Sequence, residues 1–461
     1  MQTAAILRIG SDHVSDLPFG FQPRDEDGPG GKPQDPFAMF GGGEADLSAA
    51  LHRFADLMSW SGGPVNWDLA RDVATDSAGE SDLMVGPAQT QAVSEALRLA
   101  DLWLDGVTPL PTGIRTTEAW SRKRWVQATL PVWSTLADPV AARVVEALSA
   151  LSAPGGDLAS QLPPEMAAMT GQLGGIFRQL GGAMFGSQVG QAIGLLATEA
   201  VSSTDIGLPL GPEGVAALVP TNVAAFGEGI GVPADEVRLY LALREAAHQR
   251  LFGHVPWLRS HLLALVDEYA RGISVDMSAI ESAVSELDPT NPEALQSALA
   301  GGLFEPQATP AQQASLQRLE TALALVEGWV DEVVDAAASA HLPGAGALRE
   351  TTRRRRAAGG PAEQAFATLV GLELRPRRLR DAATLWSMLA EARGVDGRDA
   401  VWAHPDLMPD TADLDDPASY VARDSGPLDL SSLGDLDAAD APTEPSAAER
   451  SDLRDGDGPT A

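Results

Sequence analysis

Residues 244–248, with the sequence Arg-Glu-Ala-Ala-His, carry the clearest chemical pattern in this chain. Their spacing matches His-Glu-x-x-His, in which two histidines four residues apart bind Zn²⁺ from one helix face. The glutamate of that motif acts as a general base on the metal-bound water. Here Glu245 and His248 stand in the expected positions, but Arg244 replaces the first histidine. A guanidinium stays protonated and has no lone pair for a metal, so the chemistry depends on this substitution.

A helix is expected to carry this motif, beginning after Pro233 and ending near Gly253. Arg244 and His248 fall on one apolar stripe, which predicts that both side chains face the interior. The stripe also contains Val237, Tyr240, Leu241, Leu251 and Phe252. The polar residues that fall mostly on other faces are Asp235, Glu236, Arg238, Gln249 and Arg250. Because an unpaired buried charge is very costly, Arg244 should have an anionic partner.

That partner is predicted to come from a second helix over residues 316–338. Leucine and valine recur there at helical spacing, and Glu327 lies on the same apolar stripe, with Asp331 one turn later. An acid in an apolar stripe is expected only where a metal ion or an arginine satisfies it. Both possibilities stay open from the sequence.

Four stretches make the chain similar to a known family. They are residues 63–71 (Gly-Pro-Val-Asn-Trp-Asp-Leu-Ala-Arg), 244–258, 326–331 (Val-Glu-Gly-Trp-Val-Asp) and 371–379 (Gly-Leu-Glu-Leu-Arg-Pro-Arg-Arg-Leu). Over roughly residues 15–410 the chain resembles the zincin-like metallopeptidases of a largely helical bacterial group. Some members of this group are described as zinc-dependent metalloproteases. Others are described as associated with the biosynthesis of a deazaflavin coenzyme.

The resemblance implies a zinc-dependent, metallopeptidase-like hydrolase that acts on a peptide or protein substrate. In that reading Glu245 activates water, while His248 and Glu327 hold the metal. Arg244 would clamp an anionic substrate group or the developing oxyanion. Since a zinc site usually takes three or four protein ligands, His254 and Asp331 are the candidates to complete it.

The alternative is a catalytically inactive protein of the same fold. Arg244 and Glu327 would then form a buried ion pair in place of the metal, with His248 hydrogen-bonded beside them. Such a protein would act as a binding or scaffold protein. A contact of about 3 Å between the guanidinium and the carboxylate would favour this alternative.

Composition predicts a mainly α-helical fold, because few segments alternate with period two and only 5% of the residues are aromatic. The formal net charge of −32 argues against a nucleic-acid partner, since phosphates would be repelled. The chain has no cysteine, which excludes thiol chemistry and fits a cytoplasmic location. Neither a signal peptide nor a membrane partner is expected.

The chain is expected to divide into a loop-rich or disordered segment (residues 1–45), a helical zincin-like domain (46–405) and a disordered acidic tail (406–461). The tail holds 15 acidic residues against 3 arginines. Within the helical domain, Gly182, Gly186, Gly190 and Gly194 recur every four residues. This pattern predicts a buried helix whose glycine groove admits another helix, packed behind the motif helix. Two arginine clusters, at residues 353–356 and 375–380, are interpreted as a solvated or salt-bridged surface or, alternatively, as an anion-binding site.

Overall fold

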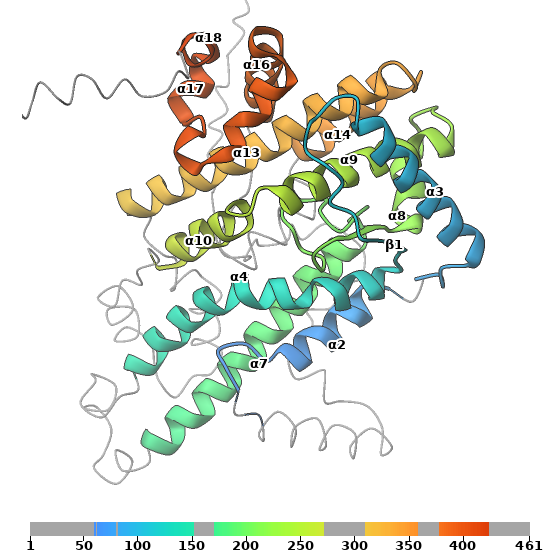
Figure 1. Ribbon diagram of the computed structural model, residues 1–461. Helices are drawn as coiled ribbons and strands as arrows, with labels where there is room; N and C mark the ends of the chain where they lie inside the picture. Colours follow the sequence, from blue (N-terminus) through green and yellow to red (C-terminus); the bar gives the residue numbers. More distant parts are fainter. Residues whose placement is uncertain are drawn as a thin grey trace, which may run out of the picture.

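The computed structural model of this 461-residue chain describes residues 60, 62–79, 82–151, 170–271, 309–357 and 378–423. In these ranges the chain is built from helices and one two-stranded sheet (Figure 1). The predicted mainly α-helical class is therefore confirmed. The expected N-terminal segment 1–45 and most of the matching stretch 371–379 lie outside the described residues.

The first helical layer consists of α2 (Trp67–Ser77), α4 (Arg122–Leu151) and α7 (Thr170–Ala197), which lie together in the lower half of Figure 1. The glycine stripe of α7 faces α2. A Cβ atom on Gly186 would lie 2.6 Å from the carbonyl oxygen of Asn66, and one on Gly190 would lie 2.6 Å from that of Ala70. The glycines therefore let two helix backbones approach closely, as predicted, although the partner is α2 and not the motif helix.

The second layer surrounds α9 (Ala234–His254), the motif helix. It packs against α3 (Pro87–Leu104), α8 (Pro220–Gly227) and α13 (Pro310–Ala338). From Tyr240 to Leu251 every residue of α9 is buried, so the prediction of a single buried stripe was too narrow. Gln249 and Arg250, expected on other faces, are 7% and 1% exposed.

Arg250 shows how this helix tolerates burial on all sides. Its guanidinium donates to the carboxylates of Asp101 and Asp105 on and just after α3, at 2.9 and 2.6 Å. It also donates to the backbone carbonyls of Asp101 and Leu110. These bonds satisfy the charge and fix α9 to α3.

A short parallel sheet positions the loop that precedes α8. Strand β1 (Thr116–Ala119) pairs with β2 (Val215–Leu218), and β2 packs on α9. Val219 donates its backbone N–H to Val201, and Ser203 donates to Ala217. The loop of residues 201–214 is thereby held against the middle of α9.

The remaining elements are α10 (Leu258–Arg271), α14 (Ala345–Ala357), α16 (Leu379–Asp399), η2 (Ala400–Ala403), η3 (Pro405–Leu407), α17 (Thr411–Asp415) and α18 (Pro417–Ala422). Of these, α10, α14, α16 and α17 pack against α13, and α14 also contacts α9, while the others join on through α16 and α17. Structured chain thus continues past the expected boundary at residue 405, and Leu414 is buried. Residues 424–461 lie outside the described part. No helix within the described ranges is long and apolar enough to cross a membrane.

Replacing Gly186 with alanine should destabilise the fold by about 1–3 kcal/mol, because the new Cβ would force α2 away from α7. Gly346 of α14 provides the control, since a Cβ there meets nothing within 4 Å. Gly346→Ala should be neutral or stabilising by up to about 1 kcal/mol. Urea unfolding followed by circular dichroism measures both, and equal effects would contradict the close approach.

Candidate functional site

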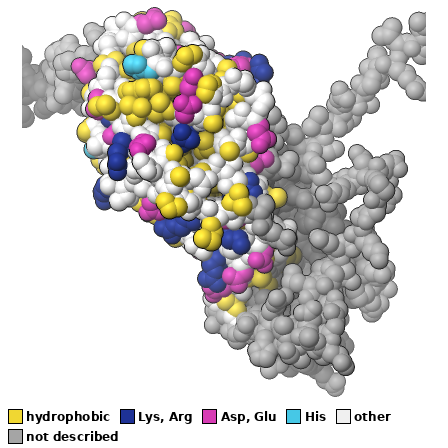
Figure 2. All heavy atoms as spheres, turned by 90° about the vertical axis from the view of Figure 1, so that its right-hand side faces the viewer, with side chains coloured by type: hydrophobic (Ala, Val, Ile, Leu, Met, Phe, Trp, Pro, Cys, Tyr) yellow, Lys and Arg dark blue, Asp and Glu magenta, His cyan; other side chains and the backbone are white. Residues whose placement is uncertain are grey.

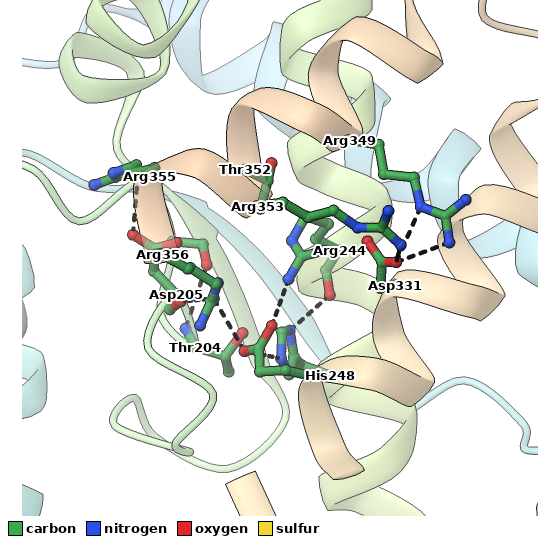
Figure 3. A network of polar contacts seen from close by, with 12 residues as sticks. Thr204, Asp205, Arg244, His248, Asp331, Arg349, Thr352, Arg353, Arg355 and Arg356 are labelled. Atoms are coloured by element: carbon green, nitrogen blue, oxygen red, sulfur yellow. Dashed lines mark hydrogen bonds and ion pairs between the residues drawn. The ribbon is translucent and has the colours of Figure 1, made fainter. Parts of the chain in front are cut away.

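Arg244 of α9 and Glu327 of α13 meet in the interior between the two helices. Arg244 Nη2 lies 2.6 Å from Glu327 Oε2, and the two side chains are 7% and 1% exposed. The distance is that of a charge-assisted hydrogen bond. The helices place the two residues as their apolar stripes predict, and the arginine reaches the carboxylate directly (Figure 3).

His248, one turn after Arg244, contacts the same carboxylate. Its Nε2 lies 3.1 Å from Glu327 Oε1, and its Nδ1 lies 2.9 Å from the backbone carbonyl of Arg244. A backbone carbonyl only accepts hydrogen bonds, so Nδ1 carries a proton and donates to Arg244, while Nε2 is directed at Glu327.

A second arginine comes from α14. Arg356 lies 3.0 Å from Glu327 Oε1 and also donates to the backbone carbonyl of Asp205 in the loop before β2. The sequence assigned Arg356 only to a basic surface cluster, without a role at this site. The signal was present in the spacing of Arg349, Arg353 and Arg356, which share one helix face.

The cations control the ionisation of Glu327. Burial alone would raise its pKa, but Arg356, His248 and Arg244 together lower the pKa to about 2. Burial acts to lower the pKa of Arg244, but the combined attraction of Glu327, Tyr240, Asp331 and Asp205 raises it. Burial lowers the pKa of Arg356. Glu327 is thus a carboxylate shared among positive groups.

Glu245, the expected general base, is buried and fully engaged elsewhere. Ser203 and Thr204 donate their hydroxyls to its two carboxylate oxygens at 2.5 and 2.6 Å. The side chain of Gln249 donates at 3.0 Å and the backbone N–H of Ala217 at 3.3 Å. Sequence reasoning did not identify these four donors, because three of them come from the loop and strand before α8. The carboxylate anchors that loop on α9.

The two further candidate ligands do not join this cluster. Asp331 lies one turn beyond Glu327, but its Oδ2 accepts from Arg349 at 2.8 Å and from Arg353 at 2.6 Å. His254 is on the surface, where its Nε2 lies 3.0 Å from the backbone carbonyl of Thr112. Of the predicted site residues, the structure brings together Arg244, His248 and Glu327.

Comparison with known proteins gives the family. The model of a family described as zincin-like metallopeptidase matches residues 65–421, which is more than half of the chain. This chain belongs to the zincin-like metallopeptidase family. The chain is also similar in fold to the crystal structure of "a putative hydrolase with a novel fold" from Chloroflexus aurantiacus. The two share 18% identity with a TM-score of 0.55, over 78% of this chain and 98% of the other. No curated protein matches the chain.

Zinc, which the family implies, does not fit the donors at this position. Arg244 cannot ligate a metal, and Glu327 already pairs with the guanidinium groups of Arg244 and Arg356. The described residues contain no group of three or more His, Cys, Asp or Glu side chains arranged to hold a metal ion. The family membership is shown, whereas zinc-dependent hydrolysis by this chain stays a prediction.

Glu327→Ala should lower the free energy of unfolding by about 3–5 kcal/mol, because it leaves Arg244 buried, and Arg356 partly buried, without their anion. The matched control is Glu213→Ala, since Glu213 pairs with Arg115 on the exposed surface. That control should change stability by less than about 1 kcal/mol. Urea unfolding measures both, and a neutral Glu327→Ala would contradict the shared-carboxylate geometry.

The low pKa of Glu327 also predicts an acid-dependent loss of stability. Because its pKa is near 2 in the folded chain and ordinarily 4.5, its ionisation stabilises the fold above pH 4.5. This contribution to stability is lost as the pH falls from 4.5 to about 2. The difference in unfolding free energy between wild type and Glu327→Gln should therefore shrink by on the order of 3 kcal/mol from pH 5 to pH 2.

Urea midpoints measured across this pH range test the linkage. The other carboxylates titrate in both proteins, so their effects cancel in the difference. A difference that stays constant with pH would show that Glu327 has no depressed pKa in the folded state.

Proposed function

We propose that this chain is a catalytically inactive member of its family, in which the Arg244–Glu327 ion pair replaces the metal and the protein acts by binding another protein. One observation carries the proposal: Glu327, the only carboxylate that reaches His248 within the described residues, is shared by His248, Arg244 and Arg356. Its oxygens face two guanidinium groups and the ring of His248.

The state of Arg244 and Glu245 supports the same proposal. A hydrolytic role for Arg244 needs its guanidinium free to clamp a substrate oxyanion, but it is 6% exposed and bonded to Glu327. A general base needs access to a water molecule, but Glu245 is 0% exposed and accepts from two hydroxyls. Both residues act here as structural connections.

The charge of the chain favours a protein partner. With a net charge of −32, it would repel a nucleic acid and attract a basic protein surface. The absence of cysteine fits the reducing conditions of the cytoplasm, where we place this interaction.

Metal analysis of the untagged protein tests the proposal. Wild type and His248→Ala, dialysed against Zn²⁺ and then against buffer, should both retain far less than about one zinc per chain by elemental mass spectrometry. Zinc at about one per chain in wild type, lost in His248→Ala, would contradict the proposal and support the metal-dependent hydrolase.

Glu245→Gln separates the two functions independently of metal content. If the protein is catalytically inactive, wild type should hydrolyse no peptide. The variant should lose about 1–3 kcal/mol of stability, because the substitution disturbs the hydrogen bonds from Ser203 and Thr204. A hydrolase predicts turnover in wild type that the variant abolishes.

A further inference from the structure

We propose that α14 is a detachable cover held over the Glu327 cluster mainly by charge, and that its local opening controls access to that cluster. This proposal does not depend on the one above, because it concerns whether the site can open and not what happens in it.

The packing of α14 is that of a helix lying on the surface, and not that of a helix in the core. Only three described side chains of α14 are buried, those of Ala345, Leu348 and Thr352. In contrast, α13 buries most of its length from Leu319 to Ala338. A helix that buries so little apolar surface gains little from the hydrophobic effect.

Charge supplies the rest of the attachment. One face of α14 directs Arg349, Arg353 and Arg356 at two carboxylates of α13 (Figure 3). Asp331 accepts from Arg349 and Arg353, and Glu327 pairs with Arg356. The spacing of four and then three residues places all three arginines on one face of the helix, so their guanidinium groups project from the same side of α14.

The end of α14 fastens the loop on the other side of the site. Arg355 donates to the backbone carbonyl of Glu199 at 2.5 Å and lies 3.6 Å from the carboxylate of Asp205. Arg356 donates to the backbone carbonyl of Asp205. Gly207 of the same loop has φ +77°, and a Cβ there would lie 2.7 Å from Glu327 Oε1. Lifting α14 would therefore uncover the Glu327 cluster and release Asp205, while Glu245 keeps Ser203 and Thr204 on α9.

These ion pairs are open to solvent on one side. The acids Asp331 and Glu327 are 1% exposed, whereas the side chains of Arg349, Arg353 and Arg356 are 15–22% exposed. Dissolved salt can therefore reach the guanidiniums and weaken their attraction, which it could not do in a sealed core. Asp331 Oδ1 and Arg353 Nε have no hydrogen-bond partner in the structure, so the contact is also incompletely satisfied.

The link before α14 is short, and it is held to α9. Residues 339–344 join α13 to α14; Leu342 is buried, and Gly344 donates its backbone N–H to the side chain of Glu236 at 2.9 Å. Opening of α14 would therefore begin after Gly344, so that α9 and α13 stay packed together.

Amide hydrogen exchange of the full chain, followed by mass spectrometry, tests the proposal. Peptides from α14 should exchange about tenfold faster in about 1 M than in about 0.05 M sodium chloride, while those from α9 and α13 keep their rates. The double variant Arg349→Gln/Arg353→Gln should exchange quickly in α14 even at low salt. Arg354→Gln is the matched control, because Arg354 is exposed and pairs with Glu350 of its own helix.

The expected pattern has α14 responding to salt and to the double variant but not to the control. If α14 exchanges in step with α9 and α13 at both salt concentrations, it opens only on global unfolding and the proposal is wrong. Equal acceleration by Arg354→Gln and the double variant would also overturn it. Should the double variant not fold, the salt comparison on wild type decides alone.

Discussion

A single buried carboxylate determines much of this architecture. Glu327 lies in the interior of α13, and a charge there is tolerated only because cations approach it from α9 and α14. Arg244 and His248 come from the motif helix, and Arg356 comes from the helix that follows α13. The relative positions of three helices are therefore coupled through one functional group.

The same principle extends along α9, which is a helix buried on every side despite its polar residues. Glu245 is satisfied by the loop before α8, and Arg250 is satisfied by α3. Each polar group points at a different neighbouring element. Such networks contribute little net stability. They disfavour other packings of the helices, because a displaced partner leaves a charge buried and unpaired.

On the proposed function, this arrangement would let the chain keep the fold of its family with Arg244 at the position of the motif's first histidine. In His-Glu-x-x-His the cation at this face is a metal, whereas here Arg244 brings its own positive charge. A second arginine, Arg356, adds to it. The site then becomes a structural connection, and α14, which carries Arg356, becomes the element that closes it.

The sequence by itself determined the helical class, the two site helices, the glycine groove and the positions of Arg244 and Glu327 on apolar stripes, because each depends on periodicity or on local chemistry. Tertiary structure alone decided the rest. The choice of α2 as partner of the glycine groove, the donors around Glu245 and the burial of Arg250 depend on contacts between residues distant in the chain. Arg356 illustrates the reason: a row of arginines has the same sequence pattern on a solvated surface and over a buried acid. Only the packing of α14 against α9 and α13 distinguishes the two.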